Sequence, residues 1–197
     1  MTSPLRRRVT IEDLIALVPS FPAVAVTGPE RSGTTIATEM ICHSTGYANV
    51  IEETWDNDFD RLWRILGERQ RVAVHAPHLT YRLHEVDEKC GDRVLVVFMQ
   101  RSVDDIVASQ RRANWGVRSG HCPDGGDPKG WGSPASRWYD GMSHELFRDV
   151  IDPDAHLCLN RQQVWERRQK ALVSHYVDVE YESLRSHSLW LEPDRRR

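Results

Sequence analysis

The sequence has neither a marked excess of charge nor a long apolar segment. Its formal net charge is −3 over 197 residues, so the chain lacks the general attraction to nucleic acid or anionic lipid that a basic protein has. The apolar run over residues 14–26 is interrupted by Pro19 and Pro22, which argues against both a signal peptide and a membrane span. We therefore expect neither nucleic acid nor a membrane as a partner.

Cysteine is also scarce, with four residues far apart and no CxxC pair. A chain of this length does not need disulfides for stability, so separate thiols favour a reduced, cytoplasmic protein. His121 and Cys122 are adjacent, but no second pair of ligands stands at a spacing typical of zinc sites. We therefore expect no bound metal.

Short apolar runs with β-branched residues alternate with longer helical patterns along the chain. The candidate strands are residues 23–27, 48–53, 72–76, 94–99 and 176–182. The run over 94–99 has no polar alternation, which is typical of a strand covered on both faces. The pattern predicts a doubly wound α/β fold in a single domain over residues 1–197, with a mainly parallel sheet and helices on both faces.

One segment breaks this alternation, because residues 114–137 hold half of the 12 glycines in the chain together with three prolines. A segment of this length inside a compact domain is typical of a lid or a binding loop. We expect an insertion or lid there, with Lys129 and Trp131 available to cover a ligand. The arginine runs at residues 6–8 and 195–197 are expected in solvated tails.

A glycine-containing loop follows the first candidate strand and leads into a helical pattern. Gly28 and Gly33 are separated by four residues, which is the spacing of a phosphate-binding loop. Such a loop turns backbone N–H groups toward an anion at the start of a helix. Thr34 stands where a nucleoside triphosphatase carries its lysine, and Arg31 inside the loop supplies the positive charge instead.

The loop resembles that of the sulfotransferase family, in which (K/R)-S-G-T-(T/S) follows the first strand. The matching residues are Arg31, Ser32, Gly33, Thr34 and Thr35. The resemblance implies a P-loop fold and binding of 3′-phosphoadenosine 5′-phosphosulfate (PAPS) as co-substrate, with its phosphosulfate end on this loop from Gly28 to Thr35. It also implies that Arg31 neutralises charge on the departing phosphate and so takes a catalytic role.

A second segment extends the resemblance. In the family, an arginine at the end of a strand and a serine eight residues later bind the 3′-phosphate, and Arg101 and Ser109 reproduce this spacing. Ser102 and Asp105 form a candidate capping box that would start the helix directly after Arg101. The proline of the family pattern is replaced by Val103.

The base that accepts the proton of the acceptor group has several candidates at predicted strand ends. His75 lies near the end of the run 72–76 and His78 follows the run, at a place where some sulfotransferases carry a catalytic histidine. Glu52 and Glu53 end the run 48–53, and some family members use a glutamate. The sequence favours His75 and leaves the other three open.

The resemblance continues to residues 181–184, which are similar to a Y-E-D-L element of the family. A basic, glycine-containing element that closes over the nucleotide near the C-terminus of many members is missing. The predicted function is sulfuryl transfer from PAPS to a hydroxyl or amine of a small-molecule or glycan acceptor. An atypical P-loop kinase or nucleoside triphosphate hydrolase and a non-catalytic nucleotide-binding protein are the alternatives. The sequence specifies neither the acceptor nor the oligomeric state.

Overall fold

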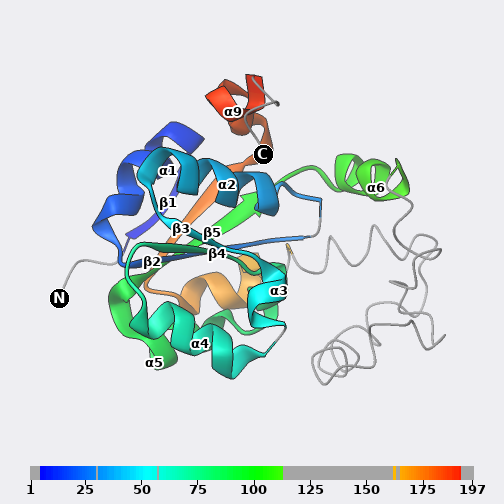
Figure 1. The fold of residues 1–197 in the computed structure, drawn as a ribbon. Helices are drawn as coiled ribbons and strands as arrows, with labels where there is room; N and C mark the ends of the chain where they lie inside the picture. Colours follow the sequence, from blue (N-terminus) through cyan, green and yellow to red (C-terminus); the bar gives the residue numbers. More distant parts are fainter. Residues whose placement is uncertain (1–4, 30, 57, 113–161, 163–164, 192–197) are drawn as a thin grey trace, which may run out of the picture.

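A six-stranded parallel sheet forms the centre of the molecule (Figure 1). The structure, a computed structural model, describes residues 5–29, 31–56, 58–112, 162 and 165–191. The strands follow the order β1-β6-β5-β2-β4-β3, and every neighbouring pair is parallel. Their bounds are β1 Leu5–Val9, β2 Ala23–Thr27, β3 Ala48–Val50, β4 Val72–His75, β5 Val94–Gln100 and β6 His175–Glu180.

Helices cover both faces of the sheet, with α1 and α2 on one face and α4 and α5 on the other (Figure 1). The α-helices are α1 Ile11–Leu17, α2 Thr34–Thr45, α3 Glu52–Trp55, α4 Phe59–Glu68, α5 Val86–Cys90, α6 Val103–Arg112 and α9 Ser188–Leu191. A π-helix spans Trp165–Gln169, and 3₁₀ helices span Val18–Ser20, Pro77–Tyr81, Leu83–Glu85, Gly91–Arg93, Lys170–Leu172 and Tyr181–Ser186. The predicted doubly wound, parallel α/β fold is confirmed.

The central strands are buried on both faces, because successive side chains of a strand point to opposite sides of the sheet. In β2, Ala23 and Ala25 pack in the apolar cluster that includes Leu62 of α4. Val24 and Val26 pack in the opposite cluster with α1 and α2. β5 alternates between the same two clusters, which explains why the run over 94–99 has no polar position.

The strand order places β2 between β4 and β5. After β2 the chain first builds β3 and β4 on one side, and then returns to build β5 and β6 on the other. Open parallel sheets bind ligands at such a reversal, outside the carboxyl ends of the strands. The carboxyl ends of β2, β4 and β5 are therefore the place in this fold where a site is expected.

Three predicted assignments differ from the structure. The arginines at residues 6–8 lie in β1, which pairs with β6 at the edge of the sheet, rather than in a tail. Exposed charged side chains suit an edge strand, because they discourage pairing with another chain. The strand expected over 48–53 ends at Val50, and Glu52 and Glu53 begin the short helix α3. The strand expected over 176–182 likewise ends early, at Glu180, and Tyr181 begins a 3₁₀ helix.

Several predictions concern residues outside the described part of the chain. They are the insertion at 114–137 with Lys129 and Trp131, the pair His121 and Cys122, and the terminal run 195–197. Within the described residues, none of the helices has the length and apolar character needed to cross a membrane.

His187 joins the C-terminal segment to α2. Its Nε2 lies 2.8 Å from Oγ of Ser44, and its Nδ1 accepts the backbone N–H of Leu189 at 3.1 Å. An Nδ1 that accepts a hydrogen bond carries no proton. Burial, and next the charge of His43, lower the pKa of His187, while Glu12 acts in the opposite direction. The fold therefore favours the neutral imidazole.

This preference predicts that the protein loses stability in mild acid. Below its ordinary pKa of about 6.5 the imidazole of the unfolded chain takes up a proton, while the folded imidazole, whose pKa is lowered, binds fewer protons at the same pH. The unfolded state then binds more protons, so the free energy of unfolding falls as the pH falls. Urea denaturation at pH 7.5 and 5.5 measures this difference. His187→Asn should lose less stability between the two values than the wild type does, and an equal loss in both would contradict the assignment.

Candidate functional site

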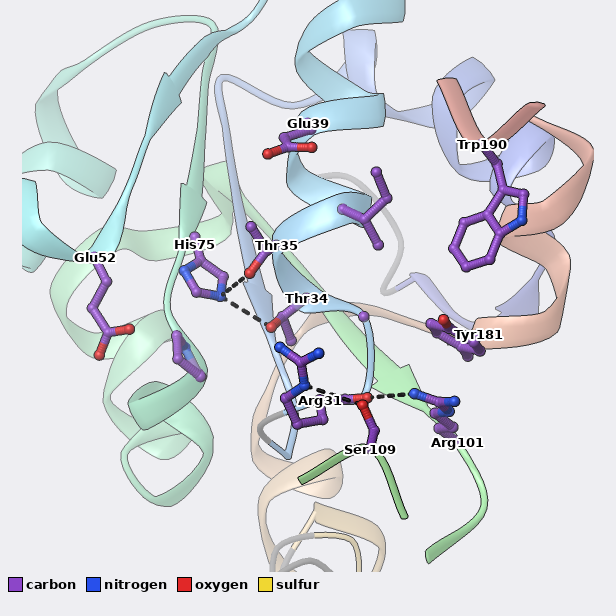
Figure 2. Close-up of a pocket in the computed structure, with 13 residues that line it drawn as sticks. Arg31, Thr34, Thr35, Glu39, Glu52, His75, Arg101, Ser109, Tyr181 and Trp190 are labelled. Carbon is purple, nitrogen blue, oxygen red and sulfur yellow. Dashed lines mark hydrogen bonds between the residues drawn. The ribbon is translucent and has the colours of Figure 1, made fainter. Parts of the chain in front are cut away.

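A cavity of about 430 Å³ opens at the carboxyl ends of the central strands. It is bounded by the loop after β2, the start of α2, the ends of β4 and β5, and the segment after β6 (Figure 2). Its lining residues are Arg31, Gly33, Thr34, Thr35, Ile36, Glu39, Glu52, His75, Pro77, Arg101, Ser109, Tyr181 and Trp190. The cavity thus lies at the reversal of the strand order and contains most of the residues predicted from sequence.

The loop between β2 and α2 has the backbone form of an anion-binding turn. Gly28 and Gly33 have φ values of 139° and 98°, and Arg31 between them has a φ of 69°. Ser32 donates its N–H to the carbonyl oxygen of Pro29 at 3.0 Å. Gly33 is the N-cap of α2, and no side chain caps this end. The first N–H groups of the helix are therefore available to an anion in the cavity.

Arg31 lies in the middle of the site and is joined to a distant part of the chain. Its Nε donates to Oγ of Ser109 on α6 at 3.2 Å. A non-glycine residue with positive φ is uncommon and costs conformational energy, and such residues cluster at binding sites. Two residues that the sequence assigned to different phosphates, Arg31 and Ser109, thus lie within hydrogen-bonding distance of each other.

Arg101 follows the last residue of β5 and holds the loop from the other side. Its Nη1 donates to the carbonyl oxygen of Arg31 at 2.9 Å, and its guanidinium lies 3.9 Å from the centre of the Tyr181 ring. Its Nε is buried and has no hydrogen-bond partner among the described residues, and the same holds for Oγ of Ser32. Buried donors without a partner are rare in proteins, so a polar ligand beside Arg101 would complete its hydrogen bonding.

The helix that carries Ser109 begins where the sequence predicts. Oγ of Ser102 accepts the N–H of Asp105 at 3.2 Å, and the same hydroxyl donates to the Asp105 carboxylate at 2.7 Å. α6 starts at Val103, directly after this cap. The predicted start of the helix after Arg101 is therefore confirmed, and it directs Ser109 back toward the loop.

His75 ends β4 and contacts the start of α2. Its Nε2 lies 3.0 Å from Oγ1 of Thr34 and 3.3 Å from Oγ1 of Thr35 (Figure 2). Its carbonyl oxygen accepts the indole N–H of Trp55 at 3.2 Å. The imidazole is therefore part of the support of the phosphate loop as well as of the cavity wall.

Glu52 and His78 form a pair on the same wall. Nε2 of His78 lies 2.9 Å from Oε1 of Glu52, and the two side chains are 26% and 25% exposed. Glu52 lines the cavity, so His78 orients a carboxylate toward it. Glu53 is exposed and is absent from the lining of this cavity among the described residues. Of the two glutamates, Glu52 is therefore the one in a position to act.

The sequence did not indicate Ile36, Glu39, Pro77 or Trp190 as members of the site, and it singled out Tyr181 only as part of the element similar to Y-E-D-L. Glu39 could have been found, because it lies one helical turn after Thr35 on the same face of α2. Trp190 has no comparable signal, since it reaches the cavity from a short C-terminal helix far from the loop in sequence.

Cys42, one of the two cysteines among the described residues, lies on α2 and has a weakly acidic thiol. Burial, and next the charge of Glu39, raise the pKa of the Cys42 thiol to about 11. At neutral pH the group is a thiol rather than the reactive thiolate. Among the described residues, no cluster of three or more histidine, cysteine or acidic side chains could hold a metal ion.

Comparison with known proteins adds little to this geometry. No family model matches the chain, and no curated protein matches it. Among solved structures, the shikimate kinase from Acinetobacter baumannii in complex with shikimate matches with a TM-score of 0.46 and 12% identity. The match covers 83% of this chain and 86% of that chain. A similarity this low says nothing of activity, so the sulfotransferase resemblance stays a prediction.

Gly33 offers a test of the loop. A Cβ at this position would lie 2.6 Å from Cδ2 of Tyr181, and the φ of 98° disfavours any side chain. Gly33→Ala should therefore lower the free energy of unfolding by about 1–3 kcal/mol and disturb the contact between Tyr181 and Arg101. The measurement is urea denaturation.

Gly67→Ala is the matched control, because Gly67 lies in α4 and a Cβ there would meet its nearest atom at 3.7 Å. Alanine is the better helix former, so this variant should be stabilised by about 0.5–1 kcal/mol. If both variants change stability by the same amount, the close approach of Tyr181 does not restrict the residue at position 33.

Proposed function

We propose that this site binds PAPS and transfers its sulfuryl group to a hydroxyl or amine acceptor. The observation that carries the proposal is the convergence of Arg31, Ser109 and Arg101 on a loop with no lysine at its helix end. Positive charge then lies within the loop and beside it, where two separate anionic groups of one nucleotide could be bound.

The residues of the loop fit an oxyanion group on the 5′ side of the nucleotide. Gly33 leaves the start of α2 uncapped, so the N–H groups of the first turn of this helix are available to phosphate oxygens. Thr34 and Thr35 line the cavity beside them. Arg31 lies at the same place and can neutralise the charge that develops on the departing phosphate, as fixed positive groups commonly do in group transfer.

Arg101 and Ser109 fit a second anionic group, the 3′-phosphate. Nε of Arg101 lacks a partner among the described residues, and Ser109 is buried and contacts Arg31. A phosphate oxygen could accept from both the guanidinium and the hydroxyl, and hydrogen bonds of this charge-assisted kind are the stronger ones. The same arginine already fixes the loop, so binding of the two groups would be coupled.

PAPS supplies an activated sulfuryl group, and transfer requires a base that takes the proton of the acceptor. Glu52 lines the cavity and is oriented by His78, whereas Nε2 of His75 faces two hydroxyls of the loop. We assign the base to Glu52, and His75 acts as a positioning residue that holds Thr34 and Thr35. The acceptor proton then passes to a carboxylate oxygen of Glu52.

The second candidate function is phosphoryl transfer from a nucleoside triphosphate. It is favoured by the spacing of Gly28 and Gly33 and by Thr35, which stands where P-loop enzymes use a hydroxyl to hold Mg²⁺. Oγ1 of Thr35 lies 3.3 Å from Nε2 of His75, and the carboxylates of Glu39 and Glu52 line the same cavity, where P-loop nucleoside triphosphatases place a carboxylate near the ion. A non-catalytic nucleotide-binding protein would share the loop and lack turnover.

The proposal predicts a preference for a nucleotide with a 3′-phosphate. Adenosine 3′,5′-bisphosphate should bind more tightly than AMP, because the additional phosphate meets Arg101 and Ser109. Arg101→Ala should remove this preference, a loss of about tenfold or more in affinity on the scale of hydrogen bonds to charged groups. Isothermal titration calorimetry with both ligands, and with ATP in the presence of Mg²⁺, measures the three affinities.

Arg64→Ala is the matched control, because this arginine is exposed on α4 and should leave all three affinities unchanged. Equal binding of AMP and the bisphosphate by the wild type would contradict the 3′-phosphate site. Tighter binding of ATP with Mg²⁺ than of the bisphosphate would favour the kinase alternative.

The assignment of the base predicts different effects for two residues on one wall. Glu52→Gln should lower kcat by about 10²-fold or more, the usual scale for a general base, and leave the Kd of adenosine 3′,5′-bisphosphate unchanged. His75→Ala should weaken binding of the bisphosphate, because it removes the partner of Thr34 and Thr35. Turnover assays with PAPS and calorimetry separate the two.

Glu53→Gln is the control for the loss of one negative charge at α3, and it should retain wild-type turnover. If His75→Ala abolishes turnover with unchanged nucleotide affinity while Glu52→Gln stays active, the base is His75, as the sequence favoured.

A further inference from the structure

The cavity has walls of different chemistry on either side of the phosphate loop. Figure 2 shows Glu52 and His75 on one side of Arg31, and Tyr181 and Trp190 on the other. The first wall carries a carboxylate and an imidazole. The second is aromatic and is built from the segment after β6. A nucleotide held at the loop would therefore have its two ends in unlike surroundings.

We propose, on the basis of the function proposed above, that Trp190 and Tyr181 form the subsite for the nucleobase. Stacking on an aromatic side chain is a common way for proteins to bind a base, because every base has a flat π-face. The acidic wall with His75 is left for the acceptor, next to the group that takes its proton. The direction in which the nucleotide lies is thereby fixed.

Tyr181 is held rigidly between the loop and its neighbours. Its ring centre lies 3.9 Å from the Arg101 guanidinium carbon. Trp190 approaches at 5.5 Å between ring centres and at an interplanar angle of 84°. Figure 2 shows Tyr181 between these two side chains, and the ring is so close to Gly33 that a Cβ there would lie 2.6 Å from it. Tyr181 therefore fixes the aromatic wall directly beside the start of α2.

Trp190 completes the wall from α9. Its backbone N–H donates to the carbonyl oxygen of His187 at 2.9 Å, and its neighbour Leu189 is 3% exposed in the core. Trp190 itself is only partly buried and lines the cavity. An indole fixed by its backbone and by an edge contact to Tyr181 loses little freedom when a base packs on it, which favours binding.

The charge distribution on the aromatic side of the cavity also suits a nucleobase. The charged group that lies against Tyr181 is the guanidinium of Arg101, 3.9 Å from the centre of the ring, and Glu39 lines the cavity from α2. Ile36 on α2 adds an apolar side chain to the cavity. A neutral heteroaromatic ring packs well in such surroundings, whereas a sugar or an amine gains more from the carboxylate of Glu52.

The experiment compares AMP with ribose 5-phosphate, which carries the same phosphate and no base. Wild-type protein should bind AMP more tightly than ribose 5-phosphate. Trp190→Ala should lower the affinity for AMP by about tenfold, the scale of one base–aromatic stack. It should leave the affinity for ribose 5-phosphate unchanged. Trp190→Phe should keep most of the AMP affinity. Calorimetry measures each Kd, and thermal unfolding checks that every variant is folded.

Trp190→Leu is included because it keeps an apolar side chain on α9 and so preserves the packing if Trp190→Ala unfolds. It should lose AMP affinity as the alanine variant does. The subsite is overturned if wild-type protein binds both ligands with equal affinity. It is also overturned if the folded variants lower the affinity for both ligands equally, or lower neither affinity.

This outcome is separate from that of the proposed function. The sulfotransferase proposal depends on the gain from a 3′-phosphate, which neither AMP nor ribose 5-phosphate carries. If Trp190 contributes to AMP binding but a 3′-phosphate does not raise the affinity, the nucleobase subsite stands and Arg101 and Ser109 do not bind a 3′-phosphate. A gain from the 3′-phosphate with no effect of Trp190 would do the reverse.

Discussion

The guanidinium of Arg101 joins three segments of the chain, and the site depends on it. It donates to the carbonyl oxygen of Arg31 in the phosphate loop at 2.9 Å and lies 3.9 Å from the centre of the Tyr181 ring after β6. It stands itself at the end of β5. The left-handed backbone at Arg31 is strained, and a hydrogen bond to its carbonyl oxygen stabilises it. A change at any of the three segments therefore affects the loop.

The parallel sheet makes this arrangement possible. Carboxyl ends of neighbouring parallel strands meet at one edge, so β2, β4 and β5 deliver Arg31, His75 and Arg101 to the same cavity. Thr34 follows Gly33, where a phosphate loop with a lysine would carry it, and two arginines from different segments line the cavity instead. Each arginine can offer several N–H donors to oxyanions, and each is fixed by a hydrogen bond to its neighbours.

Local patterns in the sequence predicted the parts of the fold that depend on local forces. Three such features depend on residues that are close together in the sequence: the buried run of β5, the cap formed by Ser102, and the glycine conformations of the loop. The structure confirms these local features. The strand β1 could not be read from residues 6–8, because its pairing with β6 joins residues far apart and its side chains are exposed. The same reason hides Trp190, whose place in the site follows from tertiary packing alone.

The choice between sulfuryl and phosphoryl transfer depends on where the positive charge lies. A triphosphate carries negative charge on three successive phosphates. P-loop enzymes neutralise this charge with a lysine and with Mg²⁺, which is held by a hydroxyl and a carboxylate. In this protein Thr34 stands at the lysine position, and the hydroxyl of Thr35 lies 3.3 Å from an imidazole nitrogen of His75. The two arginines lie within and beside the loop. Such a distribution suits one anionic group on the loop and a second group next to it, and this is the physical ground of our proposal of a nucleotide with phosphates on both its 5′ and 3′ sides.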